Sequence, residues 1–218
     1  MLNTLHVTAP LKADVDAGAL TGELDRLYGG LAHRRVVVDD DATGRRLADG
    51  LRDRGYACSA ELVMALSAPR DRESAGADAG ECSSDDLGAV ERAFMRAEGR
   101  AEDLIDELLA MRGALWAARP GTRWFVARAD GRPGASATLY SDGTVAQVED
   151  VGTLPELRGR GLGRAVVCAA VDAAVAAGHE LVFLVADADD WPRNLYAKLG
   201  FREIGREWAC LREAARAA

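Results

Sequence analysis

The stretch RGRGLGRA, residues 158–165, places three glycines and three arginines in eight residues, between TLPEL and an apolar run that begins at Ala165. The first backbone amides of a helix have no partner inside the helix, and that end carries a partial positive charge. Glycines let the chain curl so that several amides point at one anion, and arginines pair with phosphate oxygens. The stretch therefore predicts a pyrophosphate site at a helix start. A glycine-rich turn with solvated arginines is the alternative.

Two other phosphate-binding motifs do not match this stretch. A P-loop needs a lysine followed by Ser or Thr, and the stretch contains no lysine. A dinucleotide fingerprint fits better at first, because Asp187 ends the next apolar run, where a ribose-binding acid belongs. However, its third glycine is missing, since Arg164 or Val166 occupies that position. The elements before the turn also indicate an antiparallel meander and not a parallel unit.

Composition limits the class of protein. The chain has 218 residues, of which 49% are hydrophobic and 28% charged, enough for one or two domains. It contains neither a run of about 18 apolar residues nor a signal-peptide pattern at its start, so we expect a cytoplasmic protein without a membrane partner. A formal charge of -8 disfavours a nucleic-acid surface.

The cysteines and histidines indicate no metal site. Four cysteines lie far apart without a CxxC pair, so we expect plain thiols and neither a disulfide framework nor bound zinc. They are Cys58, Cys82, Cys168 and Cys210. The three histidines show no ligand spacing.

The residues before the glycine-rich stretch divide at a segment rich in Ser, Ala, Gly and charge. We predict a linker over residues 68–82 and an N-terminal α/β extension over residues 1–67. Periodicity within the extension predicts a helix, a strand, a second helix and a second strand, at residues 17–28, 34–40, 43–55 and 60–66. Residues 36–56 weakly resemble residues 181–201, so one interpretation of the extension is a degenerate copy of half of the main domain.

The main domain is predicted to span residues 83–218. Its patterns indicate two helices, a three-stranded antiparallel meander, the glycine-rich turn with its helix, a buried strand, and a short helix before one or two closing strands. The ranges are 87–99 and 102–118 for the helices, 122–130, 134–143 and 144–153 for the meander, 165–178 for the third helix, 180–187 for the buried strand, and 192 onward for the last helix.

Two motifs in this domain carry a family resemblance. VGTLPELRGRGLGRAVV, residues 151–167, resembles the coenzyme A signature of the GNAT (GCN5-related) N-acetyltransferases, and LYAKLGF, residues 195–201, resembles that family's closing motif at the expected distance. The resemblance covers roughly residues 76–218. It implies the GNAT-type acyl-CoA N-acyltransferase fold, an α/β fold with a mixed central sheet flanked by helices.

The resemblance also implies acetyl-CoA as cosubstrate. In this family the cofactor lies where two parallel strands splay apart, here the strands at 144–153 and 180–187. The pantetheine would pair with backbone near Val151 and Thr153, and the pyrophosphate would lie on the amides of residues 158–164. The implied cofactor-binding residues are Val151, Thr153, Arg158, Gly159, Arg160, Gly161, Leu162, Gly163 and Arg164.

Acetyl transfer to an amine needs a base, because an alkyl ammonium has a pKa of about 10.4. Glu149 and Asp150 are the candidates, and alternation along a strand directs them to opposite faces. We prefer Glu149 because alternation places it on the same face as Val151 and Thr153. For each carboxylate, a surface pair with an arginine is the alternative.

Tyr196 matches the tyrosine that often serves the family as general acid toward the thiolate. Its alternative is a core residue with its hydroxyl near water. The chain departs from the family at Asp189 and Pro192, where an asparagine and an alanine are usual. The first change puts the asparagine contact to the pantetheine in doubt, whereas Pro192 suits a first helical turn.

These features together predict an N-acetyltransferase that moves an acetyl group from acetyl-CoA to a primary amine on a small molecule or peptide. A non-catalytic acyl-CoA-binding or regulatory module is the alternative. We expect no nucleic-acid partner and no metal, and a homodimer is compatible with the sequence.

Overall fold

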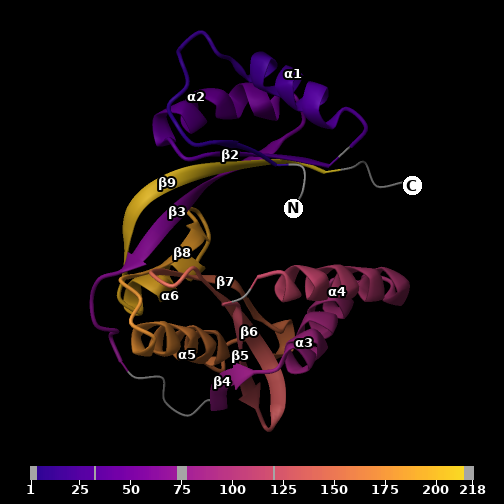
Figure 1. The fold of residues 1–218 in the computed structure, drawn as a ribbon. Coiled ribbons are helices and arrows are strands. Elements are labelled where there is room, and N and C mark those ends of the chain that lie inside the picture. Colours follow the sequence, from indigo (N-terminus) through magenta and orange to yellow (C-terminus); the bar gives the residue numbers. More distant parts are fainter. Residues whose placement is uncertain (1–3, 32, 73–77, 120, 214–218) are drawn as a thin grey trace. The chain divides into compact units, whose positions relative to one another are not determined.

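The computed structural model describes residues 4–31, 33–72, 78–119 and 121–213, which form two compact units (Figure 1). The first unit contains Met1–Met64, Val185–Asn194 and Glu203–Ala218, and the second contains Ala65–Leu184 and Leu195–Arg202. The sequence predicted one break, at residues 68–82, whereas this division also assigns two C-terminal segments to the N-terminal unit. Among the described helices, none has the length and apolar character to cross a bilayer.

The first unit is a small α/β sandwich. Its elements are β1 (Thr4–Val7), α1 (Ala17–Tyr28), β2 (Arg34–Val38), α2 (Asp41–Arg52), most of β3 (Ala57–Leu66) and most of β9 (Phe201–Arg212). The strand order is β1-β2-β9-β3, with β1 parallel and β9 antiparallel to β2. Leucines of α1 and α2 pack on Val36 and Val38 to form the core. The two predicted helices and two predicted strands are confirmed, and β1 is an addition.

The cysteine expectation is wrong for one pair. Cys58 on β3 and Cys210 on β9 form a disulfide across neighbouring strands, although 152 residues separate them in sequence. Strand pairing brings them together, with Cα atoms 4.0 Å apart, and spacing in the sequence could not reveal it. Cys82 and Cys168 are free thiols.

The second unit contains the predicted meander. Its elements are β4 (Asp78–Cys82), α3 (Ser84–Ala97), α4 (Glu102–Ala117), β5 (Arg123–Ala129), β6 (Arg132–Ser141), β7 (Val145–Thr153), α5 (Leu162–Ala176), the start of β8 (Leu181–Asp187) and most of α6 (Pro192–Lys198). The strand order is β4-β5-β6-β7-β8, antiparallel except for the parallel pair β7 and β8. The expected mixed α/β sheet flanked by helices is confirmed.

The predicted linker contains a strand. Residues 78–82, DAGEC, form the edge strand β4, antiparallel to β5. The segment has no β-branched residue and little apolar alternation, so its own preference for a strand is weak. Residues 78–82 form a strand because their backbone groups pair with those of β5.

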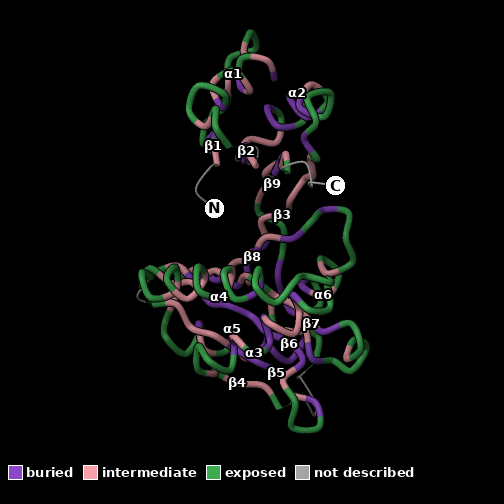
Figure 2. Tube along the Cα trace, turned by 90° about the vertical axis from the view of Figure 1, so that its right-hand side faces the viewer, coloured by how far each residue is buried: buried purple, intermediate pink, exposed green. Residues whose placement is uncertain are grey.

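Helices cover both faces of this sheet. Figure 1 shows α5 on one face and α3 with α4 on the other. Figure 2 shows buried residues concentrated along β5, β6 and β7, and residues 134–139 of β6 are all buried. This two-sided cover fixes the end of β7, and with it the chain that leads into α5.

Candidate functional site

The glycine-rich stretch forms an uncapped helix start. Gly159 and Gly161 have φ of +76° and +80°, in the left-handed region that favours glycine. Gly161 is the N-cap of α5, where no side chain accepts a capping hydrogen bond. The amide of Ala165 makes the first helical bond, to the Gly161 carbonyl over 3.0 Å. The three amides before it, from Leu162 to Arg164, therefore have the geometry of an anion site.

The same helix start lies against the end of β7. A Cβ added to Gly163 would lie 3.1 Å from Oγ1 of Thr153, which is a tight contact. The segment predicted to meet the pantetheine and the segment predicted to meet the pyrophosphate are therefore neighbours.

The arginine side chains are less available than the sequence suggested. Arg164 is 8% exposed, and its guanidinium donates to Oδ1 of Asp71 over 2.7 Å. Arg160 pairs with Asp130 over 2.9 Å, and Nε of Arg158 lies 3.4 Å from the Thr153 carbonyl oxygen. The expectation that all three side chains are available to a phosphate is thus wrong for Arg164, because its buried guanidinium is bonded to Asp71.

Strand β7 contains a bulge beside the candidate base. Thr138 of β6 lies opposite Glu149 and Ser136 lies opposite Gly152, so two residues of β7 oppose Ala137 alone. One of the two, Asp150, has φ of +52°.

The bulge changes which residues share a face. Residues opposite each other in a ladder lie on one face, so Glu149 and Gly152 share a face. Thr153 pairs with Ala135 and lies on the other face. The expectation that Glu149 and Thr153 share a face is wrong, because strict alternation fails across a bulge.

Strand β7 is parallel to the start of β8. Within the second unit this pairing joins Val145–Val148 to Leu181–Leu184.

A polar cluster surrounds the bulge on the face of α3 and α4. Gln147 donates from Nε2 to Oε1 of Glu149, and Tyr140 donates from its hydroxyl to Oδ2 of Asp150 over 3.1 Å. Burial raises the pKa of Tyr140 to about 12, and the charge of Asp150 acts in the same direction. The structure thus brings both candidate carboxylates into one cluster, and Tyr140 is a member that the sequence did not indicate.

An ion pair with a buried carboxylate lies near this cluster. Glu91 of α3 is 7% exposed and accepts a hydrogen bond from Arg112 of α4. Burial raises the pKa of the Glu91 carboxyl, the Arg112 charge opposes this, and the Asp150 charge adds to it. The sequence held one signal for this residue, since Glu91 lies midway between buried Leu87 and Met95 at helical spacing.

Tyr196 is 7% exposed on α6, and its ring centroid lies 6.3 Å from that of Phe201. This burial suits a core role, and proton transfer by the hydroxyl is the role that the resemblance implies.

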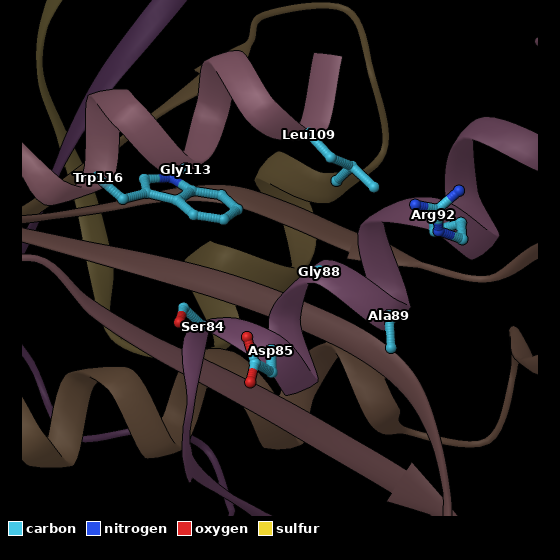
Figure 3. Close-up of a pocket in the computed structure, with 8 residues that line it drawn as sticks. All are labelled: Ser84, Asp85, Gly88, Ala89, Arg92, Leu109, Gly113 and Trp116. Atoms are coloured by element: carbon cyan, nitrogen blue, oxygen red, sulfur yellow. The ribbon is translucent and has the colours of Figure 1, made fainter. Parts of the chain in front are cut away.

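Two hollows lie in the second unit, and neither is lined by a residue predicted to be in the site. The first, about 500 Å³, is bordered by the segment after α4 and by β6, β7 and β8. The second, about 470 Å³, lies between α3 and α4, where Trp116 faces the Ser84 end of α3 (Figure 3). Glycines 88 and 113 line it, and a Cβ at either would meet no atom within 4 Å.

The comparisons agree with this geometry. The model of the acetyltransferase (GNAT) family matches residues 89–201, slightly more than half of the chain, and includes both motifs. A comparison with curated protein sequences gives no match.

Solved structures share the fold at low sequence identity. A conserved protein of unknown function from Staphylococcus epidermidis has a TM-score of 0.68 and 15% identity, covering 96% of this chain and 83% of that one. A GCN5-related N-acetyltransferase from Sphaerobacter thermophilus has a TM-score of 0.61 and 20% identity, and the match covers 91% of this chain and 67% of that one. A GCN5-related N-acetyltransferase from Kribbella flavida has a TM-score of 0.57 and 23% identity, and the match covers 92% of this chain and 79% of that one. The family model covers the uncapped helix start and the bulged strand, and it matches more than half of the chain. The chain therefore belongs to the GNAT acetyltransferase family.

Proposed function

We propose that this GNAT protein transfers an acetyl group from acetyl-CoA to a primary amine carried by a small molecule or a peptide. The observation that carries the proposal is the uncapped start of α5 beside Thr153, because it offers converging amides to a diphosphate at the end of β7. When bound, acetyl-CoA would supply the activated acetyl group and the thiolate leaving group.

Each residue then has a role. The amides from Leu162 to Arg164 hold the diphosphate, and the backbone of Val151–Thr153 orients the pantetheine arm. Glu149 removes a proton from the acceptor ammonium, while Gln147 orients its carboxylate. Tyr196 donates a proton to the departing sulfur.

The test is a calorimetric titration with acetyl-CoA, combined with an assay of CoA release over a panel of primary amines. We expect binding and release with the wild-type chain, and weaker binding by Arg158→Glu, which places a negative charge beside the helix start. Glu149→Gln is the matched control for chemistry, because it should bind acetyl-CoA normally and release CoA slowly. Folded protein that binds no acetyl-CoA would overturn the proposal. Binding without release from any amine would favour the non-catalytic module.

A further inference from the structure

The hollow of about 500 Å³ beside the bulge has a defined floor. Tyr140, Gln147 and Phe183 lie opposite one another on β6, β7 and β8, so all three side chains share the face of Glu149. The complete lining is Ala118, Arg119, Thr122, Tyr140, Ser141, Asp142, Val145, Gln147 and Phe183.

The floor connects directly to the candidate carboxylates. Gln147 donates to Glu149, and Tyr140 donates to Asp150. A molecule in the hollow would therefore lie beside the proposed base without covering it. This is the place expected for the part of an acceptor that does not react.

Arg119 is the charged donor available to such a molecule. Its guanidinium carbon lies 5.3 Å from the Tyr140 ring centroid, and it makes no ion pair with a carboxylate among the residues that the structure describes. Stacking on an aromatic ring orients an arginine while leaving its edge free to bind a carboxylate in two places.

The other polar groups of the lining are used within the protein. Oδ1 of Asp142 accepts hydrogen bonds from the amides of Thr144 and Val145, which stabilises the turn before β7 and lowers the pKa of its carboxyl. The Thr122 hydroxyl donates to the Arg119 carbonyl, and the Ser141 hydroxyl bonds His179. The hollow thus offers an aromatic floor and the guanidinium of Arg119, which together suit a short chain ending in an anion.

The spacing limits which amines fit. Gln147 and Glu149 are two strand residues apart, about 7 Å. Arg119 lies over the ring of Tyr140, which is opposite Gln147 and therefore a diagonal neighbour of Glu149, about 7 to 8 Å away. In an α-amino acid the amine nitrogen is only about 2.5 Å from the carboxyl carbon, which is too short. Two extended peptide residues span about 7 Å.

We propose that this hollow is an acceptor subsite in which Arg119 binds a carboxylate that lies several bonds from the reacting amine. The proposal rests on the transferase function proposed above. The shared chemistry is a primary amine joined to a distant carboxylate, and its sources are an amino acid with a terminal side-chain amine or a short peptide with a free N-terminus.

The experiment compares matched acceptors. One pair is 6-aminohexanoate and hexylamine, a second is glycylglycine and glycylglycinamide, and glycine tests the short spacing. Each pair represents one of the two sources. For the source that the subsite accepts, we expect the wild-type enzyme to have a KM about tenfold lower for the carboxylate member than for its partner. Arg119→Gln should remove this preference and leave the KM for hexylamine and for acetyl-CoA unchanged. Arg132→Gln, at an exposed arginine that does not line the hollow, is the control and should change nothing.

Two results would overturn the subsite. One is equal KM values within both pairs for the wild type, and the other is an Arg119→Gln variant whose KM for hexylamine rises as much as its KM for the carboxylate acceptor. If no amine is acetylated, the transferase proposal fails and the subsite is judged by calorimetry on the acetyl-CoA-loaded chain. Binding of 6-aminohexanoate or glycylglycine that depends on Arg119 would support the subsite alone, whereas binding that Arg119→Gln leaves unchanged, or no binding, would overturn it as well.

Discussion

Tyr140 on β6 donates a hydrogen bond to Asp150 on β7 over 3.1 Å, at the residue where β7 takes positive φ. A non-glycine residue in this conformation is held by its surroundings, and aspartate tolerates it better than most. The bond gives Asp150 a structural role in the bulge, and we therefore propose Glu149 as the carboxylate for proton transfer.

This assignment predicts different results for two isosteric changes. Glu149→Gln should lower kcat about 100-fold, because the amide cannot accept the ammonium proton. Asp150→Asn should keep kcat within about threefold, since the amide oxygen still accepts from Tyr140 and asparagine tolerates positive φ. Measurement of kcat against pH for both variants is the check, and the opposite ranking would make Asp150 the base.

Two glycines at opposite ends of α5 provide a matched pair for the cofactor site. Gly161 and Gly178 have φ of +80° and +82°, and a Cβ at either meets no atom within 4 Å. Alanine at each position should therefore cost a similar backbone strain of about 1 to 2 kcal/mol. Only Gly161→Ala should weaken acetyl-CoA binding in calorimetry. Equal weakening by Gly178→Ala would mean that the effect is loss of helix stability and not loss of the anion site.

The role of Tyr196 can be separated from packing. Tyr196→Phe keeps the ring that lies near Phe201, so we expect a change in the melting temperature of no more than a few degrees. Without the hydroxyl, kcat should fall at least tenfold while acetyl-CoA affinity stays the same. Tyr28→Phe, which removes a hydroxyl that donates to the Thr4 carbonyl, is the control and should keep full activity. An unchanged kcat in Tyr196→Phe would leave the tyrosine only its core role.

Stability of the first unit depends on a close contact at Gly44. A Cβ at this position would lie 2.3 Å from the Trp208 ring, whose Nε1 donates to Asp41 over 2.9 Å. Gly44→Ala should therefore destabilise the fold by about 1 to 3 kcal/mol. Gly22→Ala, in the middle of α1 where a Cβ meets no atom within 4 Å, should stabilise it by about 0.5 to 1 kcal/mol. Urea unfolding measures both, and a stabilised Gly44→Ala would contradict the contact.

A carboxyl pair in the first unit predicts a pH dependence of stability. Burial, a hydrogen bond with Glu207 and the charge of that carboxylate together raise the pKa of Glu61 to about 7. A raised pKa means that the folded state binds the proton more tightly, so this contribution to stability is complete below about pH 4.5 and is lost as pH rises through 7.

The measurement is the melting temperature between pH 5 and pH 8. Glu61→Gln stays neutral at every pH, so its melting temperature should fall less over this range than that of the wild type. Glu207→Gln should give a similarly flattened curve, because it removes the second charge. Parallel curves for the wild type and Glu61→Gln would rule out this pair as the origin of the slope.

Much of the fold was predictable because its signals are local. Ser83 caps α3 by accepting from the Asp86 amide, a contact between residues three apart in the sequence. The meander followed from three short runs separated by glycine turns, and Asp130 and Gly131 do take positive φ at the first turn. The edge strand at residues 78–82 was missed because its pairing, and not its composition, makes it a strand.

The site was predictable only where one segment builds it. The amides at the start of α5 follow from glycines placed directly before a helix, whereas the face of Glu149 depended on a bulge that simple alternation does not show. The Glu91–Arg112 pair joins two helices, and the sequence of either helix alone does not indicate which residue of the other one it contacts.

The sequence by itself determined the glycine-rich helix start, most of the order of helices and strands, and the family, because these depend on backbone preferences and apolar periods within a few residues. Only the tertiary structure decided that Arg164 turns to Asp71, that Cys58 meets Cys210 and that Arg119 stacks over Tyr140. Each of these contacts joins residues on separate segments, and such pairs are chosen by how strands and helices pack, which no local pattern specifies.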